Sequence, residues 1–183
     1  MSRIFVKDRK FYQTAMTLAA PVVLQNMITI MVNLLDTIML GSYGEVQLSG
    51  SSLANSFVGI YQILCMGIGG GAAVLTAQYW GANDQVALRK TTVLMIRVSL
   101  LFALIFSVLS LAVPEQVMRL YSSEEEVIMA GAIYLRIVSP TFIITGLSQT
   151  LTIVLRSTRE VRLPLINSMV SLFTNLFFNW ILI

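Results

Sequence analysis

Mostly apolar stretches recur along the chain and are separated by short polar connections. They cover about residues 11–40, 52–79, 93–113, 127–155 and 163–183. Each reaches the roughly 20 residues that an α-helix needs to cross the hydrocarbon core of a bilayer. Their apolar residues form long runs instead of the one-sided stripes of soluble helices. The pattern therefore predicts an all-α integral membrane protein, a polytopic bundle with five transmembrane spans in this chain.

Local signals mark the connections and two irregular points inside the spans. Gly41 and Gly44 punctuate the first turn. Pro21 and Pro140 lie inside the first and fourth spans, where the missing backbone N–H of proline predicts kinks. Two serines followed three residues later by two glutamates have the spacing of a capping box and predict the start of the fourth helix: Ser122, Ser123, Glu125 and Glu126.

Positive charges are concentrated in the connections on one side of the predicted bundle. Nine of the 12 lysine and arginine residues lie before the first span, between the second and third, or between the fourth and fifth. The positive-inside rule then places residues 1–10 in the cytoplasm and predicts a multi-pass protein of the cell (inner) membrane. The last span ends at Ile183 without a polar flank, so we expect a fragment whose partner helices are missing.

Composition supports a membrane protein and argues against an enzyme. The chain is 56% hydrophobic and 11% charged, with a mean hydropathy of +0.80. It has one cysteine, Cys65, and no histidine, which excludes an intrachain disulfide, a Cys/His metal site and a Ser/His or Cys/His nucleophile pair. We expect no cofactor and no nucleic-acid partner.

Asp36 is the residue that most needs an explanation, because it lies inside the first span, which is otherwise uncharged from Phe11 to Leu40. A charged side chain at mid-membrane costs ~2.5–3.5 kcal/mol on insertion scales and usually faces a cavity or carries protons or ions. Asp36 also stands five residues before Gly41, near the C-terminal end of the helix, where the macrodipole disfavours an anion. Helix capping does not explain it, so we interpret Asp36 as a functional residue.

Polar residues form faces on the predicted spans. Asn26, Thr29 and Asn33 share one helical face with Asp36. The second, fourth and fifth predicted spans also carry polar rows. Their cavity-lining candidates are Gln62, Thr145, Gln149 and Ser171. Asn175 and Asn179 on the fifth span are candidate ion ligands.

Two interpretations of these faces remain open. In the first interpretation, most of the groups form hydrogen bonds between helices, worth ~0.6 kcal/mol each on average in a membrane protein. Alternatively, carboxylate and amide oxygens suit Na⁺, while a carboxylate held out of water favours a proton. The residues do not choose between Na⁺ and H⁺ as the ion at Asp36.

Two other features are interpreted as structural. Arg136 in the fourth span is a snorkelling or packing cation, with an ion pair to Asp36 as the alternative. A cluster of glycines lacks the Lys-Ser/Thr pair and preceding strand of a phosphate loop, and predicts close helix packing or a flexing point: Gly67, Gly69, Gly70 and Gly71.

Several strings, in this order and spacing, resemble the multidrug and toxic compound extrusion (MATE) family over nearly the whole chain. They match its first helix, the cytoplasmic end of its second helix, its loop between helices four and five, and its fifth helix: Pro21 with Asp36–Gly41, Gln78–Ala82, Leu155–Pro164, and Asn175 with Asn179. Ser157 and Arg159 stand where glycines are common in the family, and some members have an aspartate in place of Asn179.

The resemblance implies a twelve-helix antiporter built of two six-helix lobes. Such a protein exports amphipathic, mostly cationic compounds in exchange for Na⁺ or H⁺ by alternating access. Residues 11–183 would be a partial N-terminal lobe, with membrane lipid and the missing C-terminal lobe as its partners. By the same resemblance, Asp36 corresponds to the carboxylate of the N-lobe cation site and Asn175 to an amide of that site.

Two alternatives stay open at this point. A lipid-linked sugar flippase of the same superfamily would need more cationic residues along its cavity than this chain offers. A membrane scaffold without transport activity would use the polar faces only to hold helices together.

Overall fold

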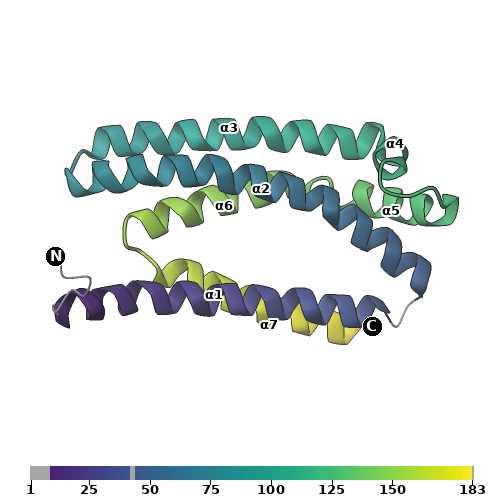
Figure 1. Ribbon diagram of the computed structural model, residues 1–183, viewed down its shortest axis with the longest axis horizontal. Helices are drawn as coiled ribbons and strands as arrows, with labels where there is room; N and C mark the ends of the chain where they lie inside the picture. Colours follow the sequence, from purple (N-terminus) through teal and green to yellow (C-terminus); the bar gives the residue numbers. More distant parts are fainter. Residues whose placement is uncertain (1–8, 42–43, 183) are drawn as a thin grey trace, which may run out of the picture. The chain divides into compact units, whose positions relative to one another are not determined.

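The computed structural model describes residues 9–41 and 44–182, without the side chains of residues 36, 39–41, 179–180 and 182. In this part of the chain all regular structure is helical, as predicted (Figure 1). The helices are α1 (Arg9–Gly41), α2 (Glu45–Gly81), α3 (Gln85–Ala112), α4 (Pro114–Arg119), α5 (Glu125–Val138), α6 (Thr141–Ser157) and α7 (Arg162–Leu182).

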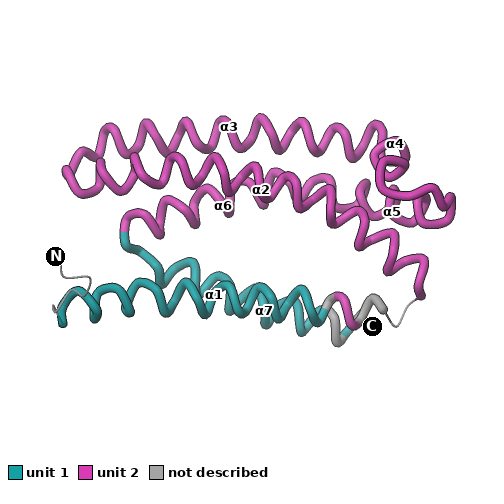
Figure 2. Tube along the Cα trace, in the orientation of Figure 1, with its two compact units in different colours: residues 1–36, 159–183 teal, residues 37–158 magenta. Residues whose placement is uncertain are grey.

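The chain divides into two compact units (Figure 2). The first unit consists of residues 1–36 and 159–183 and so contains most of α1 and all of α7. The second unit, Thr37–Thr158, contains α2 to α6.

The second unit is organised around α2, which packs against α3, α5 and α6, while α3 also packs against α6. Its core is an aromatic cluster in which the Phe57 and Phe106 rings lie 5.0 Å apart. The Tyr61 and Phe142 rings lie 5.1 Å apart, edge to face at 90°. In lipid the hydrophobic effect does not drive helices together, so they associate largely through dispersion contacts. Edge-to-face aromatic pairs add to this energy.

A close crossing of α2 and α5 depends on two glycines. A Cβ placed on Gly50 would lie 2.9 Å from the backbone nitrogen of Gly131 and 3.1 Å from the carbonyl oxygen of Val127. A Cβ on Gly131 would lie 3.0 Å from the carbonyl oxygen of Gly50 and would collide with the end of the Met118 side chain. The two backbones can approach because glycine has no side chain. Close approach of this kind increases the contact area between membrane helices.

The helices agree with the predicted spans in part. Among the described residues, three helical segments are long and apolar enough to cross a membrane: Arg9–Leu35, Glu45–Gly81 and Gln85–Ala112. The predicted fourth span is two helices, α5 and α6, bent by 58° at a break that contains Pro140. By contrast, α1 continues through Pro21 without a break. The fifth predicted span covers the residues of α7, which is not one of the segments that meet this criterion among the described residues.

The connection before α5 differs from the predicted capping box. It contains the short helix α4, which begins with Pro114 as its first residue, a position where the missing N–H costs nothing. The helix α5 does start at Glu125, but its N-cap, Glu124, makes no side-chain capping bond. The Ser122 hydroxyl instead accepts a hydrogen bond from the N–H of Glu124 at 3.1 Å, and Arg119 engages the Glu125 carboxylate. The box is not formed because the N-cap is Glu124: both serines precede the capping position, and Glu125 is the first helical residue instead of the third.

Candidate coupling and substrate site

Asp36 lies in α1, five residues before the last residue of that helix, and ends the first segment of the first unit. Its side chain, like that of Asn179 near the end of α7, is outside the described residues. The backbone nevertheless fixes one point. Because α1 is continuous from Arg9 to Gly41, the steps of three, four and three residues from Asn26 to Asp36 keep this row on one helical face.

The other residues of this row are exposed in the first unit. Asn26, Thr29 and Asn33 are all exposed, and the window of α1 that qualifies as a span has no buried residue. The Thr29 hydroxyl donates to the carbonyl oxygen of Gln25 at 3.0 Å, a bond inside its own helix.

The candidates on α7 belong to the same compact unit as Asp36. Ser171 is exposed and Asn175 is half-buried. The two helices thus bring the predicted coupling residues Asp36 and Asn175 into one unit, although they are 139 positions apart in the sequence (175 minus 36).

The remaining candidates belong to the second unit. Gln62 is exposed on α2, whereas Thr145 and Gln149 are half-buried on α6. The buried face of α6 consists of their neighbours Phe142, Gly146 and Thr150. Thr145 and Gln149 therefore flank the face that packs against α2 and α3 instead of lying within it.

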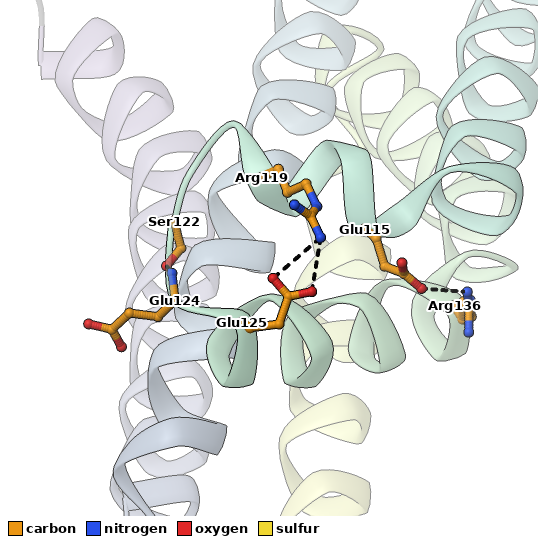
Figure 3. A network of polar contacts seen from close by, with 6 residues as sticks. All are labelled: Glu115, Arg119, Ser122, Glu124, Glu125 and Arg136. Atoms are coloured by element: carbon orange, nitrogen blue, oxygen red, sulfur yellow. Dashed lines mark hydrogen bonds and ion pairs between the residues drawn. The ribbon is translucent and has the colours of Figure 1, made fainter.

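An ion-pair network joins α4 to α5 (Figure 3). The guanidinium of Arg119 binds both carboxylate oxygens of Glu125, at 2.9 and 3.3 Å. Arg136 donates to Glu115 at 3.4 Å. Arg136 is thus paired with Glu115, as expected for a structural cation; the alternative partner, Asp36, has its side chain outside the described residues.

The glycine cluster of α2 serves close packing at one of its four positions. A Cβ on Gly69 would collide with the end of the Ile153 side chain on α6. At the other three positions, Gly67, Gly70 and Gly71, a Cβ would meet nothing within 4 Å. Close packing therefore explains Gly69 alone.

Sequence reasoning missed a buried polar cluster where α2, α3 and α6 meet. The Tyr61 hydroxyl donates to the carbonyl oxygen of Phe142 at 2.9 Å, and the Sγ of Cys65 lies 4.0 Å from the Oγ of Ser99. Near the other end of α6, the buried Thr76 hydroxyl donates to Ser157 at 2.7 Å. The signal for these residues was weak, because single hydroxyls in apolar helices usually bond their own backbone.

The family model MatE matches residues 21–181 of this 183-residue chain. The chain belongs to the MATE family. A search of curated proteins finds no match. Membership confirms the resemblance inferred from the sequence and makes the protein a multi-pass membrane transporter of small molecules, not an enzyme. The family match includes both Asp36 and Asn175.

Proposed function

We propose that this MATE transporter performs secondary active efflux, exporting amphipathic, often cationic compounds in exchange for Na⁺ or H⁺, with Asp36 as the coupling-ion site. The observation that carries the proposal is the position of Asp36: a carboxylate inside an apolar helix, within the family match, in the same compact unit as Asn175. A scaffold would have no need for a carboxylate whose insertion costs ~2.5–3.5 kcal/mol.

The same cost gives the site its coupling role. Neutralising Asp36 with a proton or Na⁺ removes most of the penalty for a charge in an apolar environment. The neutral and charged forms therefore prefer different surroundings, and an ion can shift the protein between conformations by its different affinity for each. Binding of the ion from outside would favour the conformation that releases substrate outward.

The candidate ligands favour a site with few fixed charges. Asn175 and Asn179 supply amide oxygens as ligands for a hard cation, without a second negative charge. A single carboxylate is enough to carry one proton. Asn26, Thr29, Asn33 and Ser171 would line the adjoining cavity in the first unit, and Gln62, Thr145 and Gln149 that of the second. In this proposal the N-terminus is cytoplasmic, the protein lies in the cell (inner) membrane, and a C-terminal lobe completes the transport path.

The proposal is tested by replacing Asp36 with asparagine in the transporter that contains this chain. Efflux of ethidium, a cationic amphipathic dye, is followed in cells and in proteoliposomes under imposed Na⁺ or pH gradients. We expect Asp36→Asn to reduce gradient-driven efflux to background while membrane insertion is retained.

Asp84→Asn provides a control with the same chemical change. Asp84 caps α3 by accepting a hydrogen bond from the N–H of Ala87 at 2.9 Å, and asparagine caps a helix about equally well. This variant should export at the wild-type rate. Wild-type export by Asp36→Asn would refute the proposal. If neither the wild type nor Asp36→Asn exports the dye, and Asp36→Asn has an altered detergent-sizing profile, the scaffold alternative is favoured.

A further inference from the structure

The break between α5 and α6 keeps its backbone hydrogen-bonded although it interrupts a span. The hydroxyl of Ser139 donates to the carbonyl oxygen of Arg136 at 2.9 Å. The hydroxyl of Thr141 donates to the carbonyl oxygen of Val138 at 2.6 Å. Unsatisfied backbone groups at membrane depth cost several kcal/mol, and serine and threonine side chains next to a proline remove that cost. The bent form is therefore stable without a continuous helix.

The helices on the two sides of the break are held against α2 by different kinds of contact. The α5 side rests on the Gly50–Gly131 crossing, where the two backbones touch. It is also tied to α4 by the Arg136–Glu115 ion pair. The crossing depends on backbone shape and has no single group whose removal would release it; the side-chain hydrogen bond that α5 also makes to α2, from Tyr134 to Asn55, is exposed.

The α6 side is held by polar contacts to α2 at both of its ends: the bond from Thr76 to Ser157 at the far end, and one immediately after the break. Tyr61 is fully buried, and its hydroxyl donates to the carbonyl oxygen of Phe142, the second residue of α6. Gly146, one turn later, leaves room for that hydroxyl, because a Cβ there would collide with it and would lie 2.7 Å from the Oγ of Ser99. The backbone bond across the break, from the N–H of Phe142 to the carbonyl of Ser139, is long at 3.4 Å.

We propose that the Ser139–Pro140 break is a preformed hinge and that the Tyr61 hydroxyl is the latch that holds α6 at its present angle to α5. When the latch opens, α6 moves as a rigid helix while α5 stays clamped to α2 and α4. Because α6 carries Thr145 and Gln149, the motion changes where these two polar side chains lie. The proposal concerns the second unit only and is independent of Asp36.

The hinge is tested by measuring the distance between spin labels on the two sides of the break. Ile133 on α5 and Ile144 on α6 are 55% and 67% exposed, so both accept a label without disturbing the core. Both are replaced by cysteine in a Cys65→Ser background, and the labelled chain is studied in lipid vesicles by pulsed electron paramagnetic resonance without substrate. The parent protein should give one narrow distribution.

Tyr61→Phe keeps the aromatic ring in the core and removes only the hydroxyl. Loss of one such bond should shift the equilibrium between latched and open forms about fivefold, seen as a second or broadened distance population. Tyr134→Phe is the matched control: its hydroxyl also bonds across to α2, to Oδ1 of Asn55 at 3.1 Å, but from the α5 side. This control should leave the distribution unchanged.

Pro140→Ala tests the hinge without touching the latch, because it restores the N–H that proline lacks. We expect a shift of the main population toward the longer distance of a straighter span. A distribution identical to that of the parent protein in both Tyr61→Phe and Pro140→Ala would show a static bend and overturn the proposal. An equal change in Tyr61→Phe and Tyr134→Phe would also overturn it, because the latch would then not be specific to α6.

Discussion

The contact between α2 and α5 predicts that one added methyl group at Gly50 destabilises the second unit. In Gly50→Ala the new Cβ would lie 2.9 Å from both the Gly131 nitrogen and the Ala130 Cβ, and 3.1 Å from the Val127 carbonyl oxygen. Carbon atoms ordinarily make contact at about 3.5–4.0 Å. Two of these three neighbours are backbone atoms, so relief requires the helices to separate by roughly half an ångström.

The magnitude follows from a comparison on the same helix. Overpacking by one methyl group costs about 1–3 kcal/mol. Replacing glycine by alanine inside a helix also gains about 1 kcal/mol of helix propensity, which partly hides that cost. Gly59→Ala in α2 provides the reference, because a Cβ there meets nothing within 4 Å. The propensity term is common to both variants, so Gly50→Ala should be less stable than Gly59→Ala by about 1–3 kcal/mol.

The free energy of unfolding is measured by reversible titration with SDS in mixed micelles, followed by far-ultraviolet circular dichroism. Gly59→Ala should equal or exceed the wild type in stability. If Gly50→Ala proves as stable as Gly59→Ala, the two backbones do not approach at this crossing, and the packing argument for α2 and α5 fails.

Two further predictions concern a turn and an ion pair. Arg159 has a φ of 65°, a left-handed conformation that costs a side-chain-bearing residue ~1 kcal/mol or more. Arg159→Gly should therefore raise the midpoint of SDS unfolding. Asn83→Gly, at a φ of 58°, should raise the midpoint less, because asparagine tolerates this conformation. Glu125→Gln removes the exposed ion pair with Arg119, whereas Glu126→Gln removes a negative charge from the same first turn of α5 without breaking that pair. Relative to Glu126→Gln, Glu125→Gln should lower the free energy of unfolding by less than ~1 kcal/mol at low salt and by nothing measurable at 1 M salt. A large, salt-independent loss in Glu125→Gln, or a lower midpoint in Arg159→Gly, would contradict these expectations.

The sequence by itself determined the class of the protein and its family. Long apolar runs have few folded solutions in lipid, because every backbone polar group must be satisfied within the segment, so helices followed from composition and run length alone. The same reasoning made Asp36 conspicuous, since a charge in such a run is detectable without knowing its neighbours. Pro140 marked a candidate interruption, because its missing N–H is a property of the residue itself, but Pro21 lacks the same N–H and α1 continues through it.

The tertiary structure decided what depends on contacts between distant residues. Arg136 is paired with Glu115, 21 positions away, and Tyr61 bonds to Phe142, 81 positions away. No local pattern encodes such pairs, and the capping-box prediction failed because α5 begins at Glu125 with Glu124 as its N-cap, so neither serine stands at the capping position. Whether a glycine is essential was equally a matter of packing: Gly50 and Gly131 lie where two backbones meet, while Gly67, Gly70 and Gly71 face open space. The physical reason is the same in each case. The energy of a polar or small residue in a membrane helix depends on what another helix places beside it.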